Sequence, residues 1–392
     1  MKISHVYHHY HPVLGGLERV VQSMAEEQVR MGYEVHVVTS TLGSKGEPAE
    51  GTVNDVHIHR AKAVQFGYPD LAYPLDGPWH VLRDSDIVHV HSQNSLFNIV
   101  TAKRAKKIGK AVLMDFLALD YLGSHTSPVL RFFGRVYQEK IQREAAKLAG
   151  SAVTLNARDQ RILKRKYGLE SRVVPHGIDE TYLRRPEDDT LFRDKRDIHD
   201  GNIAAYVGRV HPSKGLDTLL KAAPLVTREV DDFVLVIAGG GSPYYKEKLT
   251  KLAEKLQVEH SVHLLGYIGE TEKMSLLDSS KVFIFPTRHF GEAYPLVVDE
   301  AYARGTPVVA TNVGVLPLRI KHMETGMLVP PDDPSSLAEA LVTLLKDDDS
   351  LKRMHRKLQR VKESLLTWRQ VCERLDNAYE DLRQLGRQGI RP

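Results

Sequence analysis

Two carboxylates with a defined spacing stand out in residues 282–310, VFIFPTRHFGEAYPLVVDEAYARGTPVVA. The pattern predicts an apolar strand over 282–285, a polar loop that contains Glu292, a helix that carries Glu300, and a second apolar strand at 307–310. The loop therefore presents a carboxylate and backbone N–H groups at a helix N-terminus, where anions and polar ligands are favoured. Because ligands of open α/β sheets bind beyond the carboxyl ends of strands, this loop is a candidate binding site.

Two basic residues lie in a comparable loop earlier in the sequence. Arg209 and Lys214 follow an apolar strand predicted over 203–207 and precede a leucine-rich helix. An isolated surface Arg or Lys contributes little to stability. Between a strand and a helix, however, the same side chains can bind an anion together with helix N–H groups. A third loop, with Gly15 and Gly16, separates the first strand from its helix and lets the backbone approach a ligand closely.

The sequence pattern around these loops predicts two successive α/β domains. The 392 residues exceed the usual size of a single domain. Strand, glycine loop, helix and strand at the start of the chain form a βαβ unit, which implies a parallel sheet with a right-handed crossover. We predict an N-terminal domain at 1–183, a polar linker at 184–200, a C-terminal domain at 200–365 and an amphipathic tail at 366–392.

Composition narrows the class of protein. With 42% hydrophobic and 27% charged residues the chain is typical of a globular protein, and the single Cys372 excludes a disulfide framework. No apolar run approaches the roughly 20 residues that span a membrane. MKISHV continues directly into the first strand, so we expect a cytoplasmic protein without a signal peptide. Residues 102–172 carry 16 Lys/Arg against 6 Asp/Glu, a patch that would attract anionic surfaces.

Several motifs, in the same order, resemble the family-four retaining glycosyltransferases with the GT-B fold. They are P-x-x-GG-x-E at 12–18, V-P-x-G-x-D at 174–179, G-R-x₄-K-G at 208–215, and E-x₇-E with GTPVVAT at 292–311. The resemblance covers nearly the whole chain. It implies two facing Rossmann-like domains, with a C-terminal helix that returns to the first domain. It also implies metal-independent transfer of a sugar from a UDP- or GDP-sugar to a hydroxyl acceptor, which could be a lipid, a glycan or a small molecule.

The resemblance assigns roles to individual residues. Glu292 would lie beside the donor sugar, Glu300 would bind the ribose, and Arg209 and Lys214 would clamp the diphosphate. Since the leaving group develops negative charge and no metal site is evident, fixed cations and helix N–H groups would have to stabilise it. The other predicted contacts to the nucleotide sugar are Gly15, Gly16, Gly208, Gly239, Gly266, Ile268, Tyr294, Leu296 and Val297.

Two departures from the family pattern concern the reacting end of the site. The family generally has a histidine at the end of the strand predicted over 111–114, where this chain has Asp115, so Asp115 joins the catalytic candidates; His91 and His125 are nearby alternatives. The family usually has E-G-F-G-L at the central loop, whereas this chain has Pro295 within E-A-Y-P-L. Proline has no N–H to donate, so we expect one donor contact to be lost or rearranged.

Two other interpretations stay open. A GT-B sugar-nucleotide epimerase would share the architecture but release nucleoside diphosphate without an acceptor. A non-catalytic binder of anionic membranes would use the basic helix predicted over 131–148 and would lie on the cytoplasmic membrane face. The same helix pattern fits an ordinary solvent-exposed helix equally well. No nucleic-acid-binding motif accompanies the charge. A metal site at His8, His9 and His11 is disfavoured, because no acidic residues with ligand spacing accompany them.

Overall fold

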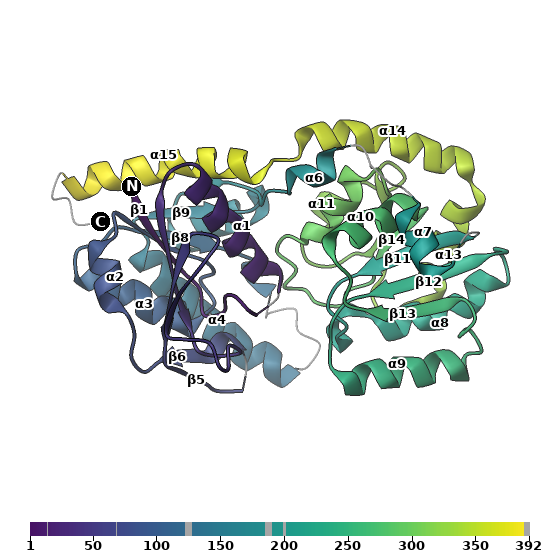
Figure 1. Ribbon diagram of the computed structural model, residues 1–392, viewed down its shortest axis with the longest axis horizontal. Helices are drawn as coiled ribbons and strands as arrows, with labels where there is room; N and C mark the ends of the chain where they lie inside the picture. Colours follow the sequence, from purple (N-terminus) through teal and green to yellow (C-terminus); the bar gives the residue numbers. More distant parts are fainter. Residues whose placement is uncertain (14, 68, 122–127, 185–189, 199–200, 388–392) are drawn as a thin grey trace. The chain divides into compact units, whose positions relative to one another are not determined.

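The structure is a computed structural model that describes residues 1–13, 15–67, 69–121, 128–184, 190–198 and 201–387 (Figure 1). The chain divides into two compact units. The first, the N-terminal unit, comprises Met1–Gly177 and the returning segment Leu366–Pro392. The second, the C-terminal unit, comprises Ile178–Leu365.

An eight-stranded sheet forms the centre of the N-terminal unit, in the order β10-β9-β8-β7-β1-β2-β4-β3. All neighbours are parallel except β3 and β4. Strand β1 is central because its apolar residues pair on both sides, Ile3 with Val35 on β2 and with Ile87 on β7. The strands are β1 (Lys2–Val6), β2 (Glu34–Ser40), β3 (Glu50–Val53), β4 (Val56–Ala61), β7 (Ile87–Val90), β8 (Val112–Phe116), β9 (Ser151–Thr154) and β10 (Arg172–Val173), with a separate hairpin of β5 (Ala63–Gln65) and β6 (Ala72–Pro74).

Helices cover both faces of this sheet. Helix α1 packs on β2 and β4 and also on the C-terminal helix α15, which in turn contacts β7 and β8 (Figure 1). Helices α2 and α3 pack on β1 and β7, and α4 packs on α3. The helices of the unit are α1 (Gly16–Arg30), η1 (Pro69–Leu71), α2 (Trp79–Asp84), α3 (Leu96–Lys107), α4 (Pro128–Leu148), α5 (Ala157–Tyr167) and α15 (Trp368–Arg387).

A six-stranded, wholly parallel sheet forms the centre of the C-terminal unit, in the order β13-β12-β11-β14-β15-β16. Its strands are buried on both faces and read as continuous apolar runs, as expected when helices cover both sides. The strands are β11 (Asn202–Val207), β12 (Phe233–Ala238), β13 (Val262–Gly266), β14 (Val282–Phe285), β15 (Val308–Thr311) and β16 (Gly326–Val329).

The helices of the C-terminal unit follow the same alternation. Helix α8 packs on α13 and α9, while α10 contacts β11 and α11 contacts β15. The helices are α6 (Glu180–Leu183), α7 (Leu191–Arg196), η3 (Pro212–Lys214), α8 (Leu216–Thr227), α9 (Pro243–Lys255), α10 (Glu270–Ser279), α11 (Leu296–Ala303), α12 (Leu316–Arg319), α13 (Pro334–Lys346) and α14 (Asp348–Ser364). Two parallel Rossmann-like sheets with a returning C-terminal helix confirm the predicted fold class.

Local details differ from the sequence prediction. The predicted linker contains helix α7, which packs on α10. Asp115 lies inside β8, whose strand continues to Phe116, because buried histidines supply the carboxylate with partners. His125 lies outside the described residues. None of the helices in the described ranges combines the length and the apolar character needed to cross a membrane.

Candidate functional site

The loop that carries Lys214 and the loop that carries Glu292 meet where the strand order of the second sheet reverses. From β11 the chain builds outward through β12 and β13, whereas β14, β15 and β16 extend the other side of β11. The gap between the ends of β11 and β14 is therefore the topological switch point, at which open α/β sheets bind ligands. Lys214 follows β11 and Glu292 follows β14, so the predicted cation and carboxylate flank this point.

Lys214 and Glu292 form an ion pair, and Thr287 Oγ1 donates a 2.9 Å hydrogen bond to the same carboxylate. Their side chains are only 20% and 11% exposed, so neither belongs to a solvated surface. Two backbone contacts hold the loops together: Arg288 N–H donates to Ser213 O at 2.9 Å, and Gly215, at φ +70°, lies against Pro286 O. A side chain at Gly215 would collide with that carbonyl.

The ionisation state of Glu292 follows from these contacts. Burial by itself would raise the pKa of this carboxyl. The positive charge of Lys214, the nearby His289 and hydrogen bonds from Lys214 and Thr287 outweigh burial and hold the pKa below its ordinary value. Glu292 is therefore a carboxylate at neutral pH, able to balance positive charge but not to donate a proton.

Glycines line the ends of the next strands. Gly208 N–H donates to Ala238 O at 3.0 Å, and Gly239 N–H donates to Gly266 O at 2.6 Å. Gly239 has φ +149°, and a Cβ there would overlap the carbonyl oxygen of Gly208. The chain after β12 thus passes so close to the chain after β11 that only glycine fits at position 239.

The second glutamate lies on α11 and is also paired. Glu300 is buried and accepts a 2.8 Å hydrogen bond from Lys273 Nζ, whose own side chain is 6% exposed. Lys273 also lies 3.1 Å from Glu270, and its ammonium stands over the ring of Tyr182. The sequence prediction missed Lys273, because a lysine inside an ordinary helical pattern gives no signal of burial.

The remaining predicted donor contacts have distinct surroundings. Pro295 is the N-cap residue of α11, so Leu296 and Val297 form the first turn. The ring of Tyr294 lies 4.0 Å from the Arg319 guanidinium. Ile268 is buried after β13, whereas Arg209 is exposed after β11. Gly15 and Gly16 belong to the N-terminal unit, at the start of α1.

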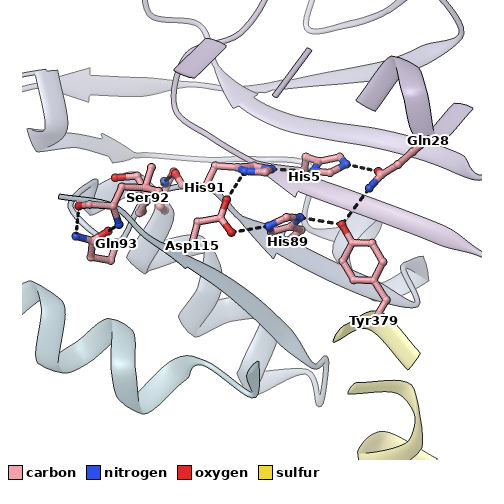
Figure 2. A network of polar contacts seen from close by, with 10 residues as sticks. His5, Gln28, His89, His91, Ser92, Gln93, Asp115 and Tyr379 are labelled. Carbon is pink, nitrogen blue, oxygen red and sulfur yellow. Dashed lines mark hydrogen bonds and ion pairs between the residues drawn. The ribbon is translucent and has the colours of Figure 1, made fainter. Parts of the chain in front are cut away.

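Asp115 lies in a buried polar network of the N-terminal unit (Figure 2). His89 Nε2 is 2.9 Å from one carboxylate oxygen and His91 Nδ1 is 2.8 Å from the other. Burial would raise the pKa of Asp115, but the two histidines hold it well below the ordinary range. Both oxygens are therefore engaged, and the side chain is 6% exposed.

Within the described ranges, one cluster has donor atoms close enough for a metal. His5, His89 and His91 each offer a ring nitrogen, all within 4.8 Å of one another. All six of their ring nitrogens already have hydrogen-bonding partners at 2.7–2.9 Å, so the contacts are accounted for without an ion. The sequence prediction considered His91 alone. The two-residue spacing of His89, on β7, and His91, directly after it, could have indicated the cluster.

Comparison with known families identifies the group to which the chain belongs. The profile of Glycosyltransferase Family 4 matches residues 14–182, and that of Glycosyl transferases group 1 matches residues 188–361. Together the two matches cover most of the chain. The chain therefore belongs to the family-four, group 1 glycosyltransferases, which have the GT-B fold.

Individual relatives are similar at lower identity. A D-inositol 3-phosphate glycosyltransferase of Corynebacterium glutamicum is 32% identical over 53% of this chain and 51% of its own length. The chain thus spans about half the length of the first curated relatives that it matches. A phosphatidyl-myo-inositol mannosyltransferase of Mycobacterium leprae is 26% identical over 89% of this chain and 88% of its own.

Solved structures show the same fold. Sucrose-phosphate synthase of Thermosynechococcus elongatus superposes with a TM-score of 0.79 at 20% identity, over 97% of this chain and 98% of the other. The Anabaena protein HepE, solved in complex with UDP-glucose, gives a TM-score of 0.75 at 15% identity, over 97% and 100%. At these identities the likeness concerns the fold alone.

Proposed function

We propose that this chain is a retaining, metal-independent glycosyltransferase that moves a sugar from a nucleotide diphosphate sugar to a hydroxyl acceptor. The observation that carries the proposal is the Lys214–Glu292 ion pair at the switch point of the second sheet. It puts a buried carboxylate and a fixed cation at the place where this type of sheet binds nucleotides. The donor is a UDP- or GDP-sugar.

Each charged residue has a defined task in this reaction. Lys214 and the exposed Arg209 stabilise the negative charge that develops on the departing diphosphate. Glu292, ionised at neutral pH, balances positive charge at the anomeric carbon of the sugar. Glu300 accepts hydrogen bonds from the ribose hydroxyls, and the hydrogen bond from Lys273 orients it. Because Pro295 offers no N–H, the donor contact that the family makes there is absent or rearranged.

The glycines at the strand ends supply room for the phosphates. Gly208, Gly239 and Gly266 carry no side chains there, and Tyr294, Leu296 and Val297 supply the adjoining turn of α11. Ile268 and Gly266 border the base. Gly15 and Gly16 form the corresponding loop of the N-terminal unit, on the acceptor side. Asp115 has both oxygens engaged by histidines, so we assign it a different role in the next subsection.

For the acceptor, we propose a hydroxyl of an inositol-type headgroup, free or lipid-linked. Relatives over half of the chain or more are named for inositol phosphate and for phosphatidyl-myo-inositol. Helix α4 exposes Phe132 and Phe133, each 66% accessible, next to the exposed Arg131 and Arg135. Aromatic and basic side chains on one helix are suited to an anionic lipid surface, so we propose peripheral attachment to the cytoplasmic membrane face through α4.

A donor and acceptor screen tests the proposal. Thermal shift with a panel of nucleotide sugars identifies the donor, because a bound ligand raises stability. Turnover is then assayed with inositol phosphate, phosphatidylinositol vesicles or no acceptor. Acceptor-dependent release of nucleoside diphosphate supports the transferase, whereas release without acceptor indicates an epimerase. Flotation with anionic vesicles, compared with the Phe132→Ala/Phe133→Ala variant, tests membrane attachment separately; equal flotation of both proteins rejects the role of α4.

A further inference from the structure

The N-terminal unit contains a closed ring of six hydrogen-bonded side chains between its sheet and the helices α1 and α15 (Figure 2). Its members are buried: His5 on β1, His89 on β7, His91 directly after β7, Asp115 on β8, Gln28 on α1 and Tyr379 on α15.

The contacts can be followed once around the ring. Tyr379 Oη is 2.9 Å from His89 Nδ1, and His89 Nε2 is 2.9 Å from Asp115 Oδ1. Asp115 Oδ2 is 2.8 Å from His91 Nδ1, and His91 Nε2 is 2.8 Å from His5 Nδ1. The amide group of Gln28 closes the ring, 2.7 Å from His5 Nε2 and 3.0 Å from Tyr379 Oη.

Counting protons shows that the ring is one proton short when Asp115 is ionised and the other five side chains are neutral. Six contacts need six protons. Three neutral imidazoles, the Tyr379 hydroxyl and the inward N–H of Gln28 supply one each, and an ionised Asp115 supplies none. One contact would then place two lone pairs against each other. Turning the Gln28 amide over exchanges its oxygen and nitrogen but leaves the count unchanged.

We propose that this ring is a proton-binding site, which holds one proton more than its neutral side chains and its carboxylate supply and thereby fastens α15 to the sheet in a pH-sensitive way. The added proton completes all six hydrogen bonds and makes the buried group electrically neutral. Without it, a carboxylate would be buried uncompensated, which is costly. The proposal is independent of the sugar-transfer proposal, because no member of the ring has a part in that reaction.

The position of the added proton follows from the neighbouring charges. Burial, together with the other histidines, lowers the pKa of His5 and of His91, so these two rings stay neutral. Burial also raises the pKa of Tyr379 and keeps its hydroxyl protonated. The added proton is then shared at the contact between Asp115 and His89, with the Gln28 amide turned over so that its N–H donates to His5 Nε2 and its oxygen accepts from Tyr379. The titratable groups next to the ring are Cys372 and Asp376 on α15, which act on Tyr379, and Glu27 on α1, which acts on Cys372.

A metal ion would be the other cation able to complete the ring, but the geometry disfavours it. The planes of the His5 and His91 rings are inclined by 22° to each other, and their facing nitrogens are 2.8 Å apart. A zinc ion bound to both would lie about 2.0–2.1 Å from each nitrogen and would need them further apart. The observed spacing is that of a hydrogen bond.

The pH dependence of the unfolding equilibrium measures whether the folded ring binds the added proton. Folding raises the proton affinity of the ring, so the associated stability is complete below the ordinary imidazole pKa of about 6.5 and is lost as pH rises through the folded value. In Asp115→Asn, the amide contributes the sixth proton itself, so no added proton is bound. Both tryptophans, Trp79 and Trp368, belong to the N-terminal unit, so denaturant titrations of the full chain followed by tryptophan fluorescence report its unfolding.

We expect the unfolding equilibrium constant of the wild type to rise, relative to Asp115→Asn, by about tenfold per pH unit above about pH 7.5. Asp381→Asn, on the exposed side of α15, should keep the wild-type pH dependence. Parallel curves for the wild type and Asp115→Asn would overturn the proposal. So would one bound metal per purified chain whose removal abolishes the difference between them.

A measurement on the wild type alone keeps the proposal testable if Asp115→Asn does not fold. Nitrogen-15 NMR of histidine-labelled full chain at about pH 8 should show one histidine of the ring with both nitrogens protonated, although a free imidazole is neutral there. Three neutral imidazoles together with an ionised Asp115, seen in its carboxyl carbon shift, would contradict a bound proton.

Discussion

Lys214 and Glu292 are 78 residues apart in the chain, yet their side chains form an ion pair across the two loops at the switch point of the second sheet. The pairing explains how a mostly buried carboxylate stays ionised. It also means that a bound diphosphate has to share or take over the lysine. Removing either partner would therefore change both the charge and the chemistry of the site.

Loss of the lysine should reduce catalysis sharply. In Lys214→Ala, we expect kcat to fall about 10²–10³-fold, since one preorganised charge that stabilises the leaving group is removed. Steady-state kinetics with the donor identified by thermal shift measure the effect. Lys251→Ala is the matched control, because Lys251 pairs with Glu247 on the exposed face of α9. A kcat for Lys214→Ala within a factor of two or so of that control would remove Lys214 from the mechanism.

The pH profile should reveal the carboxylate. The pKa of Glu292 is held below its ordinary value. At pH above this lowered pKa the carboxyl is ionised and the enzyme is active, and activity is lost as the pH falls through the lowered pKa. In Lys214→Met the main opposing charge is gone while burial remains, so the acidic limb of kcat/KM should move to higher pH. An acidic limb that stays in place would show that another group controls it.

Substitution of Glu300 should weaken binding of the donor. We expect Glu300→Gln to raise KM for the donor about tenfold, the effect of weakening one charged hydrogen bond, with a smaller change in kcat. Glu270→Gln is the control, because Glu270 is the other acidic neighbour of Lys273 and is 44% exposed. If both variants raise KM equally, the effect comes from Lys273 and not from a contact between Glu300 and the ribose.

Two adjacent glycines provide a test of the strand-end geometry. Gly239→Ala should destabilise the C-terminal unit by about 3 kcal/mol or more, because its Cβ would overlap Gly208 O and its φ is +149°. Gly240→Ala should change stability by less than about 1 kcal/mol, since nothing lies within 4 Å of a Cβ there. Denaturant unfolding compares the two variants. Similar losses in both would contradict the close approach of β11 and β12.

Much of the fold could be predicted because its strands are bounded apolar runs. Strand β14 has the predicted bounds, since it is apolar throughout and is followed by Pro286. Asp115 was expected after its strand because a carboxylate among apolar residues suggests an end. Its histidine partners, which lie on and directly after a different strand, make it an internal residue of β8.

The candidate sites could be predicted only in part. Motif residues such as Glu292 and Lys214 can be located from the sequence, and the fold brings them together. The proton ring could not be predicted in the same way. His89 and His91 show a two-residue period, but Gln28 and Tyr379 are 351 residues apart and look like ordinary helix residues. Only the packing of α15 on α1 brings those two side chains together.

The stereochemistry of the product tests the central claim most directly. The full chain is incubated with its donor and a hydroxyl acceptor, and the anomeric configuration of the newly transferred sugar is read by proton NMR before it can equilibrate. Retaining transfer predicts the same configuration as in the nucleotide sugar. An inverted anomer, or consumption of the donor without any glycosylated acceptor, would contradict it.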